Sequence, residues 1–360
     1  MNNNILENLK IVLTVFLFVV LIVPSVKKIA YHIGAVDIPG GRHIHGKIIP
    51  KLGGFAIFLG FLLGYMLFCQ QTIQMISILI GGIIILIFGI FDDIKRLPAS
   101  VQFIGQIASA AVVVFYGNIV MQDVSAYGLY INFGSLAPFL TIIFIVALMN
   151  SLNFIDGLDG LAGGIASIFF ITISIIINYM GAFNGLDASL SLIMIGATLG
   201  FLVYNFHPAK IFLGNSGSMF IGYIIAVVSL LGFKNVTITS LIIPILILAI
   251  PILDTLFAII RRSIKHKKIY EGDKDHMHHQ LLKMNFSQRK TVLVVYAIDL
   301  LFSIASIVYN IRGQKIGIII YSILLLLVIW FVLHTSIISS NIAEKTKKFE
   351  NKVLHKKTTR

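Results

Sequence analysis

The sequence has 360 residues, of which 58% are hydrophobic and 12% are charged. Soluble domains carry about 25% charged residues, and the mean hydropathy of +0.95 is far above their range. This composition excludes a soluble enzyme and predicts a polytopic membrane protein. The net charge of +13 would suggest nucleic-acid binding in a soluble protein, but here we expect no nucleic acid, because an uneven distribution of Lys and Arg across a membrane accounts for it.

Eleven apolar segments are each long enough to cross about 30 Å of hydrocarbon as a helix, which predicts an all-α integral membrane fold with about 11 transmembrane helices. The first segment lacks a small-residue cleavage site, so we expect a retained helix and not a signal peptide. The expected spans lie near 8–29, 52–69, 75–92, 101–117, 135–151, 161–180, 187–205, 216–231, 238–260, 291–311 and 315–335.

The connections on one side of these spans hold 24 of the 28 Lys and Arg residues. Positive loops stay in the cytoplasm, so the N-terminus is expected outside and the C-terminus in the cytoplasm. Residues 1–335 are then a single transmembrane domain, and 336–360 a basic cytoplasmic tail. Outside, 123–133 is expected to form a small hairpin. Nearly all the remaining ionisable residues lie in the inside loops, which places the chemistry on the cytoplasmic face.

Two adjacent carboxylates, Asp92 and Asp93, end the apolar run that starts near Ile78. Charged groups at membrane depth are costly and usually functional, so we expect this pair at the aqueous mouth of the helix bundle. Neighbouring carboxylates suit Mg²⁺, and one of them can serve as a base. The alternative is a solvated helix end balanced by Lys95 and Arg96.

The next inside loop contains Asp156 and Asp159, three residues apart, among asparagines and glycines. A helical turn would place both carboxylates on one face and line a polar cavity. The alternative is structural, with Asp156 as a helix N-cap and Asp159 in the first turn of the following helix.

Two further loops carry features that suit phosphate. The first, with Arg42, Lys47 and Lys51, is rich in proline and glycine, and Gly53-Gly54 allows close backbone approach. The second ends in Gly-Asn-Ser-Gly-Ser from residue 214, small residues that leave helix N–H groups free for an anion.

The last inside loop has the densest charge, including Arg261, Arg262 and a histidine cluster at 276–279. Arginine suits bidentate binding of a diphosphate, whereas a plain basic loop would only fix the membrane orientation. Phosphate binding is favoured over a zinc site because no cysteine accompanies the histidines. Asp299, inside the tenth span, is expected to make a helix-packing hydrogen bond.

Taken together, these loops resemble the polyprenyl-phosphate N-acetylhexosamine-1-phosphate transferases, most closely the bacterial branch that starts wall teichoic acid or O-antigen synthesis. The matching motifs, in order from about residue 20 to 310, are Val36-Asp37-Ile38-Pro39 with Pro50-Lys51-Leu52-Gly53-Gly54, Phe91-Asp92-Asp93, Asn153-Phe154-Ile155-Asp156-Gly157-Leu158-Asp159-Gly160, Asn205-Phe206-His207-Pro208-Ala209-Lys210-Ile211-Phe212-Leu213-Gly214 and His276-Met277-His278-His279.

The resemblance implies exchange of UMP for undecaprenyl phosphate on UDP-GlcNAc, with Mg²⁺ or Mn²⁺, in the bacterial cytoplasmic membrane. It implies that Asp92 and Asp93 are catalytic, with Asp92 a candidate base on the lipid phosphate, and that Asp93 also contributes to the metal site. A homodimer is left open. The residues that it implies for nucleotide and substrate binding are Lys51, Asn153, Asp156, Asp159, Asn205, Phe212, Arg262, His276, His278 and His279.

One position departs from the family pattern. Where the family has Leu-Gly-Asp, with the aspartate binding the metal, this chain has Asn215. An amide oxygen can ligate Mg²⁺ but brings no charge, so a weaker metal site is expected. Three alternatives stay open. The chain could be a member of the same family that uses another UDP-N-acetylhexosamine, or an inactive homologue on the strength of Asn215. It could also be a nucleotide-sugar or anion transporter, which would place its charges near the bilayer midplane and commonly contain inverted repeats.

Overall fold

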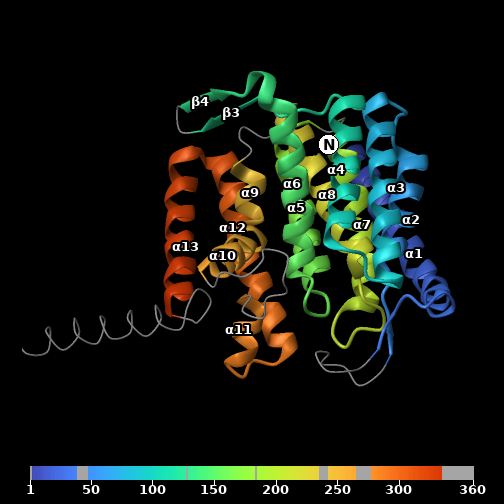
Figure 1. The fold of residues 1–360 in the computed structure, drawn as a ribbon. Helices are drawn as coiled ribbons and strands as arrows, with labels where there is room; N and C mark the ends of the chain where they lie inside the picture. The colour runs from blue at the N-terminus through green and yellow to red at the C-terminus, as the bar shows by residue number, and fades with distance from the viewer. Residues whose placement is uncertain are drawn as a thin grey trace, which may run out of the picture.

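The computed structural model describes residues 2–38, 48–126, 129–182, 185–234, 242–264 and 277–334. These residues form an all-α array with two short antiparallel strand pairs, β1 (Val36–Asp37) with β2 (Ile49–Pro50) and β3 (Asp123–Ala126) with β4 (Leu129–Asn132) (Figure 1). The helices are α1 (Asn2–Ile33), α2 (Gly53–Phe68), α3 (Ile73–Ile94), α4 (Ala99–Ala111), α5 (Ala137–Ile155), α6 (Leu161–Met180), α7 (Leu186–Asn205), α8 (Gly214–Lys234), α9 (Ile242–Ile247), α10 (Ala249–Ile264), α11 (Met277–Lys283), α12 (Gln288–Arg312) and α13 (Gln314–His334).

The predicted all-α, polytopic architecture is confirmed at this level. Within the described residues, eight helices are long and apolar enough to cross a membrane, and three shorter apolar helices accompany them at Gly53–Phe68, Ala249–Ile260 and Lys315–Trp330. The total of eleven spans and the orientation of the termini stay predictions.

Helix α8 lies at the centre of the array. In its most apolar stretch 89% of the residues are buried, against 22% in α1, which lies at the edge. Helix α8 packs against α2, α3, α5 and α7, while α1 covers α7 and α2. The beginning of α8 is therefore enclosed by other helices, and anything that its first turn binds is held in a rigid frame.

The expected single helix over 238–260 is wrong, because the structure divides this stretch into α9 and α10 with a turn at Leu248. Pro251 explains the break: it has no N–H to donate to the carbonyl of Ile247, and its ring would clash with that carbonyl in a regular helix. In Figure 1, α10 runs across the direction of the neighbouring helices.

The two ends of the array differ in structure. The predicted hairpin at 123–133 is confirmed as β3–β4, which lies at one end, and the β1–β2 pair, α11 and the loop between α7 and α8 lie at the other (Figure 1). The second end contains the candidate site.

Candidate active site

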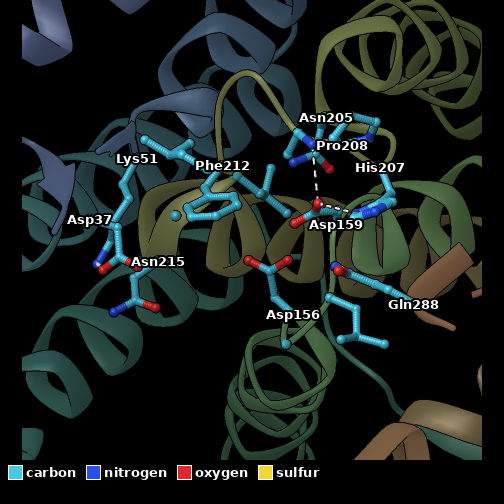
Figure 2. A pocket seen from close by; sticks show the side chains of 16 residues that line it. Asp37, Lys51, Asp156, Asp159, Asn205, His207, Pro208, Phe212, Asn215 and Gln288 are labelled. Atoms are coloured by element: carbon cyan, nitrogen blue, oxygen red, sulfur yellow. Dashed lines mark hydrogen bonds and ion pairs between the residues drawn. The ribbon is translucent and has the colours of Figure 1, made fainter. Parts of the chain in front are cut away.

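A pocket of about 510 Å³ opens among the loops at this end. Polar side chains surround it, and Figure 2 shows Lys51, Asp37 and Asn215 on one side, His207 and Gln288 on the other, and Asp156 between them. The full lining is Asp37, Ile49, Lys51, Asp156, Gly157, Leu158, Asp159, Asn205, His207, Pro208, Ala209, Phe212, Leu213, Gly214, Asn215 and Gln288. The pocket thus brings together residues from three of the matching sequence motifs, with Asn215 and Gln288 in addition.

Backbone pairing joins the segment before α8 to the start of α2. Phe212 N donates to Pro50 O at 2.8 Å, Gly53 N to Phe212 O at 3.0 Å, and Gly54 N to Leu213 O at 2.9 Å. The expected close approach at Gly53-Gly54 is confirmed, because a Cβ on Gly54 would overlap the backbone of Gly217 in α8. This contact fixes Lys51 and Phe212 as neighbours in the wall of the pocket.

Asp93 anchors the first turn of α8. Its Oδ1 accepts a hydrogen bond from Asn215 N at 2.8 Å, and its Oδ2 accepts from Ser216 N at 3.1 Å and Ser216 Oγ at 2.6 Å. A carboxylate at a helix N-terminus is stabilised by the helix dipole. The prediction that these N–H groups are free for a phosphate is therefore wrong, because Asp93 from α3 already occupies two of them.

Gly214 allows this arrangement. It adopts a φ of +76°, and a Cβ there would lie 2.5 Å from Asp93 Oδ2 and also overlap the carbonyl oxygen of Lys51. Only glycine combines that backbone conformation with that space.

Asp92 holds the turn after α3 and reaches the same helix start. Its Oδ1 accepts from Leu97 N and from Gln102 Nε2, both at 2.7 Å, and its Oδ2 accepts from Asn215 Nδ2. Asp92 and Asp93 are 3% and 5% exposed and do not line the pocket. The expectation of a pair at the aqueous mouth is thus corrected: both lie beneath the pocket, where hydrogen bonds compensate the cost of burial.

Asn215 lies in the pocket wall directly above this pair. Besides its bond to Asp92, its Oδ1 accepts from Asn153 Nδ2 at 2.8 Å, and Asn153 also donates to Ser218 Oγ at 2.9 Å. Asn153 therefore acts in this structure through Asn215 and does not line the pocket itself.

Asp156 and Asp159 lie in the loop between α5 and α6, not on a helix. Asp156 follows the last residue of α5, and α6 begins only at Leu161 after Gly160, whose φ is +81°. Both the expected helical turn and the N-cap alternative are wrong, yet the loop still directs both carboxylates into the pocket. Burial, and then the charges of Asp93 and Asp159, raise the pKa of Asp156 to about 8, although Lys51 opposes the shift.

Asp159 is bonded to the loop that follows α7. Its Oδ2 contacts His207 Nδ1 at 2.7 Å and accepts from Ala209 N at 3.1 Å (Figure 2). Asn205 lines the same wall, but its Oδ1 accepts from Gly160 N and its Nδ2 donates to Ile211 O. Because both ends of the amide are engaged, Asn205 shapes the pocket by joining two loops.

The structure does not bring Arg262 into this pocket. Arg262 is 5% exposed, and its guanidinium carbon lies 5.5 Å from the centre of the Phe154 ring, which is a cation–π distance. His278 and His279 belong to α11, although their side chains are not among those described, and His276 lies outside the described residues.

The expectation for Asp299 is also corrected. This residue lies in α12 and is fully buried, and neither carboxylate oxygen has a hydrogen-bond partner among the residues that the structure describes. The expected helix-packing bond is therefore not found within this part of the chain. Thr291 Oγ1 and Ser303 Oγ, about two turns and one turn away along the same helix, are also buried without a partner among these residues.

Several residues of the site were not predicted, among them Asp37, which pairs with Lys51. His207 and Gln288 line the pocket, and Gln102 orients Asp92. His207 belongs to a motif that the sequence analysis identified, and its place beside a proline at a helix end was an available signal. For Gln288 and Gln102 the sequence offers none, because their importance depends on contacts across the fold.

The pocket suits a divalent cation that a substrate also ligates. Among the described residues, Lys51 is the cation that lowers the pKa of Asp156, and the raised pKa indicates that more positive charge would stabilise its ionised form. Among the residues described, no three His, Cys, Asp or Glu side chains form a metal cluster, but Mg²⁺ commonly takes one or two carboxylates and completes its shell with water and substrate phosphates. The residues present fit that kind of site.

The comparisons with known proteins agree with this geometry. Residues 75–233 match glycosyl transferase family 4, which includes α3, the Asp156 loop and the start of α8. The chain is 43% identical over 340 residues to the probable undecaprenyl-phosphate N-acetylglucosaminyl 1-phosphate transferase of Bacillus subtilis, covering 92% of each chain. This chain therefore belongs to that family of membrane glycosyl-1-phosphate transferases.

More distant relatives have similar names. The decaprenyl-phosphate N-acetylglucosaminephosphotransferase of Mycobacterium tuberculosis is 33% identical over 302 residues, covering 75% of this chain and 74% of its own. The undecaprenyl-phosphate alpha-N-acetylglucosaminyl 1-phosphate transferase of Escherichia coli K12 is 28% identical over 308 residues, covering 81% of each.

Proposed function

We propose that this protein transfers N-acetylglucosamine 1-phosphate from UDP-GlcNAc to undecaprenyl phosphate and releases UMP. A phosphate oxygen of the lipid forms a bond to the sugar-bearing phosphorus, and the bond from that phosphorus to the oxygen of UMP breaks. One phosphoanhydride replaces another, so the reaction needs no further source of energy.

The observation that carries this proposal is the convergence of Lys51, Asp156 and Asn215 at the protected start of α8. Lys51 Nζ lies 3.6 Å from Asp37 Oδ1, and about a quarter of the side chain (28%) is exposed, so its charge can reach a phosphate in the pocket. Phosphoryl transfer requires mainly positioning and neutralisation of charge, and this pocket provides groups for both.

The residues of the chain have separable roles in this proposal. Lys51 binds a diphosphate oxygen, and Phe212 and the Asp159–His207 wall orient the nucleotide sugar. Asp93 and Asp92 keep the start of α8 in place beneath the reacting groups. In this resting arrangement Asp92 accepts three hydrogen bonds, so its action as a base on the lipid phosphate would require the Asn215 contact to open first.

Asp156, the Asn215 amide oxygen and the substrate phosphates would hold Mg²⁺ or Mn²⁺. Asp93 could add at most the remaining lone pair of Oδ1, since Asn215 N occupies one. The cation supplies neutralisation of the diphosphate charge and of the charge that develops on the leaving UMP. The Asn215 amide oxygen accepts one bond from Asn153, keeps one lone pair and brings no charge, which predicts weaker binding than an aspartate would give.

We place the protein in the bacterial cytoplasmic membrane with eleven spans, its N-terminus outside and this pocket facing the cytoplasm. The positive charge of the connections on that side supports the orientation. The lipid product would start a surface glycopolymer, such as wall teichoic acid or an O-antigen.

The test is transfer by the purified protein in detergent, with radiolabelled UDP-GlcNAc, undecaprenyl phosphate and Mg²⁺. We expect labelled lipid and UMP to form in equal amounts, and Lys51→Ala to lower the rate at least tenfold. Labelled sugar that crosses a liposome membrane without lipid product would overturn the proposal in favour of transport. No product even from an Asn215→Asp variant would indicate an inactive homologue.

A further inference from the structure

Among the described residues that line this pocket, His207 is the one histidine, and its ring is held by a carboxylate. The contact of 2.7 Å between His207 Nδ1 and Asp159 Oδ2 is short enough for a charge-assisted hydrogen bond. A carboxylate can only accept, so Nδ1 carries the proton in this pair and Nε2 is the ring nitrogen left for another partner.

The surroundings fix both members of the pair. Ala209 N donates to the same Asp159 oxygen, and Lys210 N donates to Tyr204 O at 2.8 Å, which closes the loop that carries His207. From α12, Arg289 Nε donates to His207 O at 3.1 Å. These bonds hold the backbone of the loop, and the Asp159 contact holds the ring. Such support is typical of a side chain that is kept in one orientation for binding.

The ring is held without being buried. The side chain of His207 is 33% exposed and that of Asp159 is 15% exposed, and both border the cavity. A ligand in the pocket can therefore reach the free nitrogen. Asn205, beside them, has both amide ends bonded to backbone and cannot compete for the same ligand group.

The position of the pair limits what it can recognise. Lys51 and Asn215 lie on the opposite side of the pocket (Figure 2), so the phosphates belong there and the His207 side receives an uncharged part of the ligand. A carbonyl could bind Nε2 only when the ring is protonated, whereas a hydroxyl can donate to the neutral ring and accept from the charged one. A hydroxyl group therefore suits both states.

We propose that His207, oriented by Asp159, is a specificity-determining residue that binds one hydroxyl group of the nucleotide-sugar donor. This inference depends on the proposed function for the identity of the donor, and it adds a residue and a recognised group. Asp159 is then a positioning residue for His207.

The experiment measures binding of UDP-GlcNAc to the purified full-length protein by calorimetry, without lipid. The variants are His207→Phe, His207→Gln and Asp159→Asn, and the matched control is His32→Phe, an exposed histidine at the end of α1. A set of UDP-GlcNAc analogues, each lacking one hydroxyl of the ribose or of the sugar, identifies the recognised group.

We expect one analogue to bind the wild-type protein about tenfold more weakly than UDP-GlcNAc, as loss of one hydrogen bond implies. His207→Phe should bind UDP-GlcNAc about tenfold more weakly and bind that analogue no worse than UDP-GlcNAc. Asp159→Asn should show part of this loss, and His32→Phe none.

Two results would overturn the inference. In the first, His207→Phe binds UDP-GlcNAc as tightly as the wild type does. In the second, it binds UDP-GlcNAc and every analogue more weakly by the same factor, as a purely structural change would cause. The proposed function fails differently: the wild-type protein would bind UDP-GlcNAc and transfer nothing to the lipid, while the analogue pattern at His207 stayed intact.

Discussion

Asp93 and Asp299 are both buried carboxylates in apolar helices, but their hydrogen bonding differs. Asp93 accepts three hydrogen bonds from the start of α8, whereas neither oxygen of Asp299 has a hydrogen-bond partner among the described residues. Burial of a polar group without a hydrogen bond is costly, so Asp299 lacks the compensation that Asp93 has. Burial of a carboxylate in this protein therefore identifies a site only when the donors around it are present as well.

Removing the Asp93 carboxylate should have the largest effect. Asp93→Ala leaves three buried donors unsatisfied at the start of α8, a loss of about 3 kcal/mol or more. We expect a much lower thermal midpoint in detergent and no measurable transfer. Asp93→Asn keeps the size of the side chain and one acceptor oxygen, so its thermal midpoint should lie between those of the wild type and Asp93→Ala. An unchanged midpoint for Asp93→Ala would show that these bonds do not hold the helix.

Restoring charge beside this cluster should have the next largest effect. Asn215→Asp adds a carboxylate to the proposed cation site and should raise the Mg²⁺-dependent rate about tenfold, a typical scale for changes at such sites. With EDTA the same variant should be less stable than the wild type, because the donor to Asp92 Oδ2 becomes a like charge. Equal rates in both proteins at every Mg²⁺ concentration would refute a metal role for this position.

The pocket carboxylate Asp156 predicts a smaller, pH-dependent effect. Burial raises the pKa of Asp156 to about 8 in the folded protein, whereas an unperturbed aspartic acid, as in the unfolded chain, has a pKa of 3.8. The unfolded chain therefore binds fewer protons between these values, and the contribution of Asp156 to stability is lost as the pH rises toward about 8. Without metal, the thermal midpoint of the wild type should fall with pH relative to that of Asp156→Asn. Parallel curves for the two proteins would contradict the raised pKa.

The smallest effect is expected at Asp299. Asp299→Asn replaces the carboxyl group with an amide of the same shape and should leave transfer unchanged within about twofold, since a conservative change away from the site costs little. Asp299→Leu is the companion variant, and it should be at least as stable as the wild type by thermal unfolding. A large loss of activity in Asp299→Asn with unchanged stability would give this carboxylate a functional role.

The fold class and part of the pocket could be predicted for clear reasons. Long apolar runs can only be helices in a membrane, and charged residues and glycines at their ends are rare enough to stand out. Asp156, Asp159 and Lys51 were predicted in this way, Phe212 was implied by the family resemblance, and all four line the pocket. The break at Pro251 could have been predicted too, because the cost of an internal proline is local.

The remaining features depend on contacts between distant segments. The roles of Asp92 and Asp93 as anchors for α8 require the α3–α8 packing, which no local pattern encodes. Gln102 and Gln288 are ordinary helix residues until Asp92 and the pocket are placed beside them. Asn205, which was predicted to contact the nucleotide, lines the pocket and also joins two loops, and this second role could not be predicted because the amide partners are distant in the sequence.

The contact of Gly54 in α2 with Gly217 in α8 limits how this pocket can evolve. Backbone meets backbone there, and a Cβ on Gly89 of α3 would similarly overlap Ser216. No side chain can be added at these crossings without separating three helices, so a change in their spacing is costly. New donor or acceptor preferences cost least at the pocket lining, in the loops at positions 159 and 207 and in the first turn of α8 at position 215, while the helices beneath keep the same geometry.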